Sequence, residues 1–248
     1  MREQIKKIIA DAIPLTDDIE RKLDVFLESI GHPNGPMTLE DVLAWYHDRK
    51  ESLEAGVTEI PLKDVGGGWF FDDETGNLKH SSGGFFEVIG VSVSTSMRES
   101  GKGWNQPMVD QGTESSVAGI IRRVTNGVAE YLLEAKFEPG NYGELQFSPT
   151  LQVTYSNLNA LHAGRRPLFT EYFDGTVPSA KVLYDHWLPE DGGRFYKKRV
   201  KNMLVEIPAG ELVDPPPSFV WLTLKNIKDL LGRDNLVNPH VRSILATM

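Results

Sequence analysis

An unusual run of uncharged polar residues occupies the middle of the chain. Every second residue in it carries a hydrogen-bonding side chain, so on one extended strand these side chains share a face. Six such groups without charge suit a ligand with many hydroxyl groups; a solvent-facing strand rich in serine and threonine is the alternative. The residues are Gln146, Ser148, Thr150, Gln152, Thr154 and Ser156.

Two glutamates are candidates for proton transfer, although most glutamates in any protein are simply solvated. Glu138 precedes Pro139-Gly140, a turn where the backbone can come close to a ligand, and it adjoins the polar run. Glu171 precedes the aromatic pair Tyr172-Phe173, whose rings are expected to desolvate the carboxyl group and raise its pKa. A raised pKa makes a carboxylate a better general base, and we therefore favour Glu171 slightly.

A basic stretch follows later in this acidic chain. Arg194, Lys197, Lys198, Arg199 and Lys201 fall within nine positions. Because guanidinium and ammonium groups pair well with phosphate oxygens, the stretch predicts an anion site, with a solvated charged face as the alternative.

The composition limits the possible classes of protein. The chain has 248 residues, 40% hydrophobic and 25% charged, as in a folded globular domain, and its net charge of −9 argues against general nucleic-acid binding. No stretch approaches the roughly 20 apolar residues of a membrane helix, and the first residues do not resemble a secretory signal. Cysteine is absent and the six histidines show no metal-ligand spacing. We expect a cytoplasmic protein that contains no metal and that binds neither nucleic acid nor a membrane.

These residues must be positioned by a sheet and its helices. Residues 1–50 read as a helical segment, with an apolar stripe at Ile19, Leu23, Phe26, Leu27 and Ile30 and a further helix after Thr38. Strands are predicted at 117–123 and 128–136, joined by a tight turn at Asn126-Gly127, and at 151–155 and 203–207. Helices are predicted at 180–188 and from Thr223 onwards.

This order of elements predicts an α+β fold, with a mixed β-sheet flanked by helices and an N-terminal helical segment. We expect two parts, the helical segment at 1–50 and a single module at 51–248.

Short motifs are spread in order from about Thr38 to the C-terminus. They are Gly68-Trp69, Gly84-Phe85-Phe86, Trp104-Asn105-Gln106-Pro107, Glu138-Pro139-Gly140-Asn141, Ser148-Pro149-Thr150 with Gln152, Thr154, Ser156 and Asn157, Glu171-Tyr172-Phe173, Asn202-Met203, Trp221-Leu222-Thr223-Leu224 and Asn235-Leu236-Val237-Asn238. Each motif is weak alone, but their shared order resembles the NDP-hexose 2,3-dehydratases of deoxysugar pathways.

The chain departs from that family pattern in three places. The family usually has Arg-Asn-Arg-Asn-Met where this chain has Arg199-Val200-Lys201-Asn202-Met203, and Met-Asp where this chain has Pro239-His240. Well-known members carry two fused copies of the module, whereas this chain carries one. The resemblance also implies a Nudix-like fold, but the sequence has no Nudix box to hold magnesium, which disfavours diphosphate hydrolysis.

The resemblance implies a lyase acting on a nucleoside-diphosphate 4-keto-6-deoxyhexose, with dTDP as the expected nucleotide. The C4 ketone acidifies the hydrogen on C3, and the C2 hydroxyl then leaves from the enolate, so the reaction needs a base, a proton donor and hydrogen-bond donors near the C4 oxygen. It needs no redox cofactor, and we expect none. The product, a 3,4-diketo-2,6-dideoxyhexose, is expected to pass to a ketoreductase.

Within this scheme, Glu138 or Glu171 is the expected base and Tyr155 or Tyr172 the donor to an oxygen. The expected substrate-binding residues are Trp104, Gln106, Asn141, Gln146, Ser148, Gln152, Thr154, Asn157, Arg194, Lys197, Arg199, Asn202 and Trp221. Arg194, Lys197 and Arg199 would hold the diphosphate, and Trp104 or Trp221 would stack on the base. A homodimer would replace the two fused modules; the alternative is a non-catalytic nucleotide-sugar-binding module or partner subunit.

Overall fold

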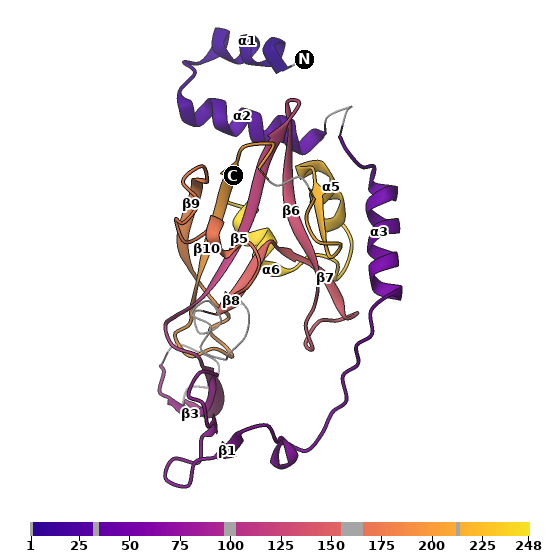
Figure 1. Ribbon diagram of the computed structural model, residues 1–248. Helices are drawn as coiled ribbons and strands as arrows, with labels where there is room; N and C mark the ends of the chain where they lie inside the picture. The colour runs from indigo at the N-terminus through magenta and orange to yellow at the C-terminus, as the bar shows by residue number, and fades with distance from the viewer. Residues whose placement is uncertain (1, 32–34, 97–102, 155–165, 212–213) are drawn as a thin grey trace.

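The fold consists of two β-sheets and a set of helices (Figure 1). The computed structural model describes residues 2–31, 35–96, 103–154, 166–211 and 214–248. The helices are α1 (Arg2–Ala12), α2 (Asp17–Ile30), α3 (Leu39–Glu51), α5 (Leu224–Leu231) and α6 (Pro239–Leu245), with 3-10 turns η1 (Leu62–Asp64) and η2 (Thr170–Tyr172). None of the helices in these ranges is long and apolar enough to cross a membrane.

The larger sheet has seven strands. Its main order is β11-β6-β5-β10-β9, while β7 pairs with β6 and β8 pairs with β5. β10 runs parallel to β5, and the other pairs of this sheet are antiparallel, so the sheet is mixed and the predicted α+β class is confirmed. The strands are β5 (Glu114–Thr125), β6 (Val128–Phe137), β7 (Leu145–Pro149), β8 (Leu151–Thr154), β9 (Lys181–Pro189), β10 (Arg199–Ile207) and β11 (Phe219–Leu222).

Side chains on the two faces of this sheet form two hydrophobic cores. The first core lies under α3, α5 and α6, which contribute Val42, Ile227 and Ile244 among others. The second core lies on the opposite face, against the segment around η2. Alternate residues of β6 belong to different cores, as a strand buried on both faces requires: Leu133 packs in the first and Leu132 in the second.

The central hairpin opens into a fork. β5 and β6 pair next to their turn, where Asn126 (φ 52°) and Gly127 (φ 79°) adopt the left-handed backbone that the dipeptide predicted. Farther from the turn the two strands separate, and β7 and β8 fill the gap. Thr150 lies at the branch point, where its hydroxyl accepts a hydrogen bond from Ile121 N (2.9 Å) and donates one to the Leu132 carbonyl.

The prediction that the polar run lines one face is wrong, because the chain bends at Thr150. Phe147 packs in the first core, whereas Leu151 and Val153 pack in or against the second. Gln146 and Ser148 therefore lie on the second-core side, and Gln152 and Thr154 on the first-core side. One extra residue at the bend shifts the strand alternation by one position, and Ser156 lies outside the described residues.

A smaller sheet of four antiparallel strands lies at one end of the molecule (Figure 1). Its strands are β1 (Trp69–Phe71), β2 (Leu78–His80), β3 (Glu87–Val93) and β4 (Trp104–Asp110). β4 is joined to the β9–β10 loop by backbone hydrogen bonds from Val109 N to Arg194 O and from Tyr196 N to Val109 O, both 2.8 Å.

Residues 180–188 are not the predicted helix; they form most of β9. This strand pairs along its length with β10, from Arg199↔Pro189 to Glu206↔Lys181, so sheet pairing outweighs local helical pattern here.

At the N-terminus the predicted helices are present, but the apolar stripe of α2 is only partly covered: Leu23 and Leu27 are buried, whereas Phe26 and Ile30 are exposed.

Candidate active site

A row of charged residues occurs at the end of β6, beside the fork. Glu134 and Lys136 alternate along the strand, so both lie on the second-core side, and Glu138 follows directly after it. Across the β6–β7 pairing, Glu134 faces Ser148 and Lys136 faces Gln146. We call Glu134, Lys136, Glu138, Ser148 and Gln152 the fork cluster.

Direct contacts join Lys136, Glu138 and Gln152 within the fork cluster. Lys136 Nζ lies 3.5 Å from Glu138 Oε1 and donates a hydrogen bond of 3.1 Å to the backbone carbonyl of Gln152. Gln152 Nε2 in turn donates a hydrogen bond of 3.1 Å to Glu138 Oε1. The carboxylate is therefore held from β6 and β8 at once, and about a third of the Glu138 side chain (32%) remains accessible to a ligand.

Glu134 has the most strongly shifted carboxyl pKa among the described residues. Burial raises its pKa from 4.5 to about 7; the positive charge of Lys136 opposes this rise, and the negative charge of Glu138 adds to it. Its cross-strand partner Ser148 is fully buried, and the Ser148 hydroxyl has no hydrogen-bond partner within the described part of the chain. A carboxyl group that titrates near neutral pH can both take and give a proton.

A second group of ionisable residues lies where α6 meets the end of β9 and β10. His240 Nε2 and Lys198 Nζ are each 3.8 Å from Glu190 Oε2. Burial lowers the pKa of His240, with Glu190 and Glu138 opposing and Lys198 and Lys136 reinforcing that effect. Burial also lowers the pKa of Lys198. We call Glu190, Lys198 and His240 the α6 cluster; its charge interactions with Glu138 and Lys136 place it next to the fork cluster.

The arrangement provides the components of general acid–base chemistry. Glu138 is an accessible carboxylate, Glu134 a carboxyl group with a pKa near 7, and Lys136 a positive charge beside both. Uncharged amides adjoin them at Gln146 and Gln152. Among the described residues no group of three or more His, Asp or Glu side chains converges in a way that could hold a metal ion.

The structure brings several predicted site residues to this region. Glu138, Ser148 and Gln152 belong to the fork cluster, and Gln146 adjoins it, with its Nε2 donating to Asn235 O (3.1 Å). Asn141 supports the same strand end, since its amide donates to Lys136 O (3.4 Å) and Glu144 O (3.2 Å). Thr154 ends β8.

Asn202 lies beneath α6 in the first core. Its Oδ1 accepts a hydrogen bond of 2.7 Å from Ser243 Oγ, and its Nδ2 donates one of 3.0 Å to Val200 O. Asn202 is 1% exposed, so both ends of its amide are occupied by protein groups and its contacts fasten α6 to β10.

Other predicted residues lie on the smaller sheet and the β9–β10 loop. Trp104 Nε1 donates to Gln106 Oε1 (2.7 Å), and Gln106 Nε2 donates to Gly193 O (2.9 Å). Arg194 is bound to Asp191 at 2.7 Å. These contacts tie the smaller sheet to the loop and do not reach the fork cluster.

The basic stretch does not converge as a single anion site. Arg199 pairs with Glu114, and Lys201 Nζ is 2.9 Å from Asp185. Lys197 has a left-handed backbone (φ 51°) and its ammonium group lies over the ring of Tyr196. Most of these charges are thus neutralised by local partners.

Glu171 and Tyr172 lie in η2, on the second-core side. Tyr172 and Phe173 pack against the second core, and burial raises the pKa of Tyr172. No described contact joins Glu171 to the fork cluster. Trp221 is a second-core residue with Arg123 stacked on its ring at 3.9 Å, so that ring is already covered. Tyr155 and Asn157 lie outside the described residues.

Sequence reasoning missed Glu134, Lys136, Glu190 and His240 as members of a site, and it placed Lys198 only in the basic stretch. The alternation of charges in Glu134, Lys136 and Glu138 was a usable signal, because charged residues on a strand with apolar neighbours on its other face need partners. No local pattern could have joined His240 to Glu190, since they lie fifty positions apart in the sequence.

Comparison with known proteins assigns the family. The sequence model described as NDP-hexose 2,3-dehydratase matches residues 39–248. The chain belongs to the NDP-hexose 2,3-dehydratase family. The resemblance read from the ordered motifs is thereby confirmed.

Curated relatives of the family match most of the chain. The dTDP-4-dehydro-6-deoxy-alpha-D-glucopyranose 2,3-dehydratase of Saccharopolyspora spinosa is 36% identical over 247 residues, which are 99% of this chain and 49% of the relative. The protein of the same description from Amycolatopsis orientalis is 37% identical over 86% of this chain and 45% of its own length. The chain therefore spans about half the length of the curated relatives it matches.

Solved structures that match part of the chain include a Nudix hydrolase and an Ap4A hydrolase. A Nudix hydrolase from M. smegmatis has a TM-score of 0.31 at 14% identity, over 64% of this chain and 97% of that one. An Ap4A hydrolase of C. elegans has a TM-score of 0.32 at 12% identity, over 54% of this chain and 97% of the hydrolase. TM-scores this low do not assign a fold, and the α+β class rests on the sheets and helices described above.

Proposed function

We propose that this NDP-hexose 2,3-dehydratase family member removes water across C2 and C3 of a dTDP-4-keto-6-deoxyhexose to give a 3,4-diketo-2,6-dideoxyhexose. One observation carries the proposal: the fork cluster joins an accessible carboxylate, a carboxyl group with a pKa of about 7 and a lysine within a chain of this family. The curated relatives are described as acting on dTDP-4-dehydro-6-deoxy-alpha-D-glucopyranose, which supports the substrate class.

In the proposed mechanism, Glu138 takes the proton from C3, and the electron pair of the broken C–H bond moves onto the C4 oxygen as an enolate. The ammonium group of Lys136, 3.5 Å from Glu138, stabilises the negative charge that develops there. Between the expected bases, the contacts favour Glu138 over Glu171, because Gln152 and Lys136 hold Glu138 within a polar cluster.

The second half of the reaction requires a proton for the departing hydroxyl group. As the enolate collapses to the C2–C3 double bond, the C2–O bond breaks and the oxygen leaves as water with a proton from Glu134. A carboxyl group with a pKa of about 7 is protonated in a substantial fraction of molecules at neutral pH. Transfer of the C3 proton from Glu138 to Glu134 then restores the starting state of the two carboxyl groups. The elimination leaves an enol at C2–C3, which ketonises as the C3 hydroxyl loses its proton and C2 gains one, giving the 3,4-diketone, so no net proton is consumed.

The test is incubation with dTDP-4-keto-6-deoxyglucose and a ketoreductase that traps the diketone, followed by mass spectrometry. A sugar that has lost one water and gained the two hydrogens of the reduction is expected. If the protein binds the substrate and leaves it unchanged, the proposal that it is a lyase is rejected.

The second candidate is a non-catalytic nucleotide-sugar-binding module, and the length comparison is the observation that favours it. Since the chain spans about half of its curated relatives, a complete site could need a second module. We propose that a second copy of this chain supplies it in a homodimer, and that a ketoreductase consumes the product.

A further inference from the structure

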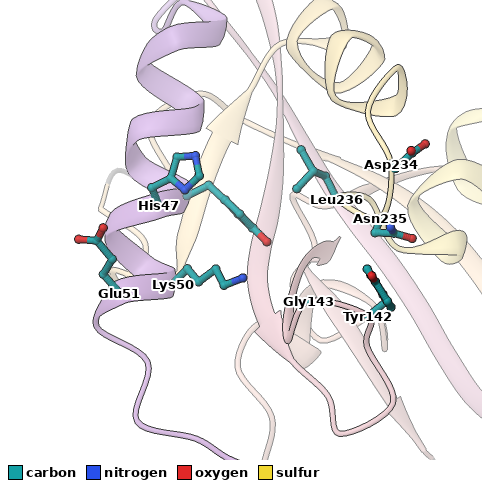
Figure 2. A pocket seen from close by; sticks show the side chains of 9 residues that line it. His47, Lys50, Glu51, Tyr142, Gly143, Asp234, Asn235 and Leu236 are labelled. Carbon is teal, nitrogen blue, oxygen red and sulfur yellow. The ribbon is translucent and has the colours of Figure 1, made fainter.

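Two cavities meet at Asp234 and Asn235. The larger, of about 630 Å³, lies between α3, the β6–β7 loop and residues 234–236; in Figure 2, His47 and Lys50 project from α3 on one side, with Tyr142 and Asn235 on the other. The smaller, of about 330 Å³, lies between β7, the end of α5 and the start of α6. Asp234 and Asn235 line both cavities, so the two cavities share one turn of the backbone as part of their walls.

Two exposed arginines line the smaller cavity. Arg233 and Arg242 line it, and neither forms an ion pair within the part of the chain that the structure describes. By contrast, Arg122, Arg123 and Arg199 are each paired with a glutamate. Unpaired guanidinium groups at a cavity attract an anion, and their planar fork matches two phosphate oxygens at once.

The other polar groups of the smaller cavity are compatible with an anion. Asp234 is the carboxylate among its lining residues, so two arginines against one aspartate leave one positive charge. The side-chain amide of Gln146 donates a hydrogen bond to the backbone carbonyl of Asn235, and Asn235 has a left-handed backbone (φ 63°). The cavity is thus formed by a fixed turn and not by free side chains alone.

The smaller cavity also adjoins the fork cluster. Gln146 lines the cavity and is the direct cross-strand partner of Lys136. A diphosphate bound by Arg233 and Arg242 would therefore hold its attached sugar beside Glu134, Lys136 and Glu138. On the other side, the larger cavity offers the ring of Tyr142, which is 80% exposed, for contact with a base.

We infer that the smaller cavity binds the diphosphate of a nucleoside-diphosphate ligand through Arg233 and Arg242, and that the larger cavity accepts the nucleoside. The inference rests on the proposed function for the identity of the sugar at the fork cluster. It assigns the diphosphate to α6 and the preceding loop instead of to Arg194, Lys197 and Arg199, which are engaged by local partners.

Calorimetric titration of the full chain with pyrophosphate, dTDP and thymidine tests the site. Pyrophosphate and dTDP should bind, and Arg242→Gln and Arg233→Gln should each weaken both by about tenfold or more, as expected for one lost charge-assisted hydrogen bond. Tyr142→Ala should weaken dTDP but not pyrophosphate. Arg21→Gln is the control: it makes the same charge change on α2, where Arg21 pairs with Asp18, and should leave both affinities unchanged.

The outcomes separate this site from the proposed activity. Equal affinity of the wild type and both arginine variants for dTDP, or no binding of either phosphate compound by the wild type, overturns the site. If pyrophosphate binds as tightly as dTDP, the smaller cavity is a site for free diphosphate. That result overturns the inference that the larger cavity binds the nucleoside. Arginine-dependent dTDP binding without loss of water from the substrate keeps the site and rejects the dehydratase. Melting curves of each variant exclude unfolding as the cause.

Discussion

The side-chain amide of Gln152 on β8 donates a hydrogen bond of 3.1 Å to the carboxylate of Glu138 after β6. Gln152 lies on β8, which pairs with the β5 arm of the central hairpin, whereas Glu138 directly follows β6, the other arm, so their contact exists because the hairpin opens into a fork. The relationship places the accessible carboxylate of the fork cluster at the junction of β6 and β8.

Replacing Glu138 by Gln should reduce turnover by about 10²–10⁴-fold, because glutamine keeps the shape of the side chain but cannot take the C3 proton. The measurement is exchange of the C3 hydrogen in heavy water, which reports proton abstraction even when elimination is slow. Glu171→Gln is the matched control and should show a smaller effect. If both variants exchange at the wild-type rate, neither glutamate is the base.

Glu134→Gln should make folding stability less dependent on pH. The pKa of Glu134 rises from 4.5 to about 7 on folding, so the unfolded chain loses this proton first as the pH increases. The stability that this group contributes is therefore full below pH 4.5 and is lost as the pH rises to about 7. Well above pH 7 the variant should be more stable than the wild type by up to about 3 kcal/mol. Urea unfolding at a series of pH values checks this, and parallel curves for both proteins would contradict it.

Thr150→Val should destabilise the fold by about 1–3 kcal/mol, because it leaves a buried backbone N–H and carbonyl at the fork without their hydroxyl partner. Thr125→Val is the matched control: the Thr125 hydroxyl is buried without a hydrogen-bond partner in the described part of the chain, so its loss should cost little. Chemical denaturation of both variants gives the comparison, and equal losses would show that the hydroxyl of Thr150 does not hold the fork.

The active form should be a homodimer, since the curated relatives are about twice as long as this chain. Sedimentation velocity at the concentration used for the activity assay measures this directly. An active monomer rules the dimer out, and an inactive monomer favours the binding-module alternative.

Local interactions within the sequence determined many of the elements. Asn126-Gly127 favours a left-handed two-residue turn in any context, and the hairpin of β5 and β6 forms there. Thr223 was recognisable as a helix start, and its side chain accepts from Asn226 N at the beginning of α5. The ordered motifs were likewise enough to indicate the family, which comparison then confirmed.

Only the tertiary structure decided which side chains meet. Residues 181–189 became a strand because β10 offers a continuous pairing partner, a contact that no local pattern contains. The polar run divided between two faces because Thr150 bridges two separating strands, Ile121 on one and Leu132 on the other. The fold also brings His240 and Glu190 together although they lie fifty positions apart in the sequence. It likewise places Arg233 and Arg242 around one cavity with Gln146. Turns and helix caps depend on neighbours a few residues away, whereas strand pairing and side-chain clusters depend on chain segments that only the folded sheet brings into contact.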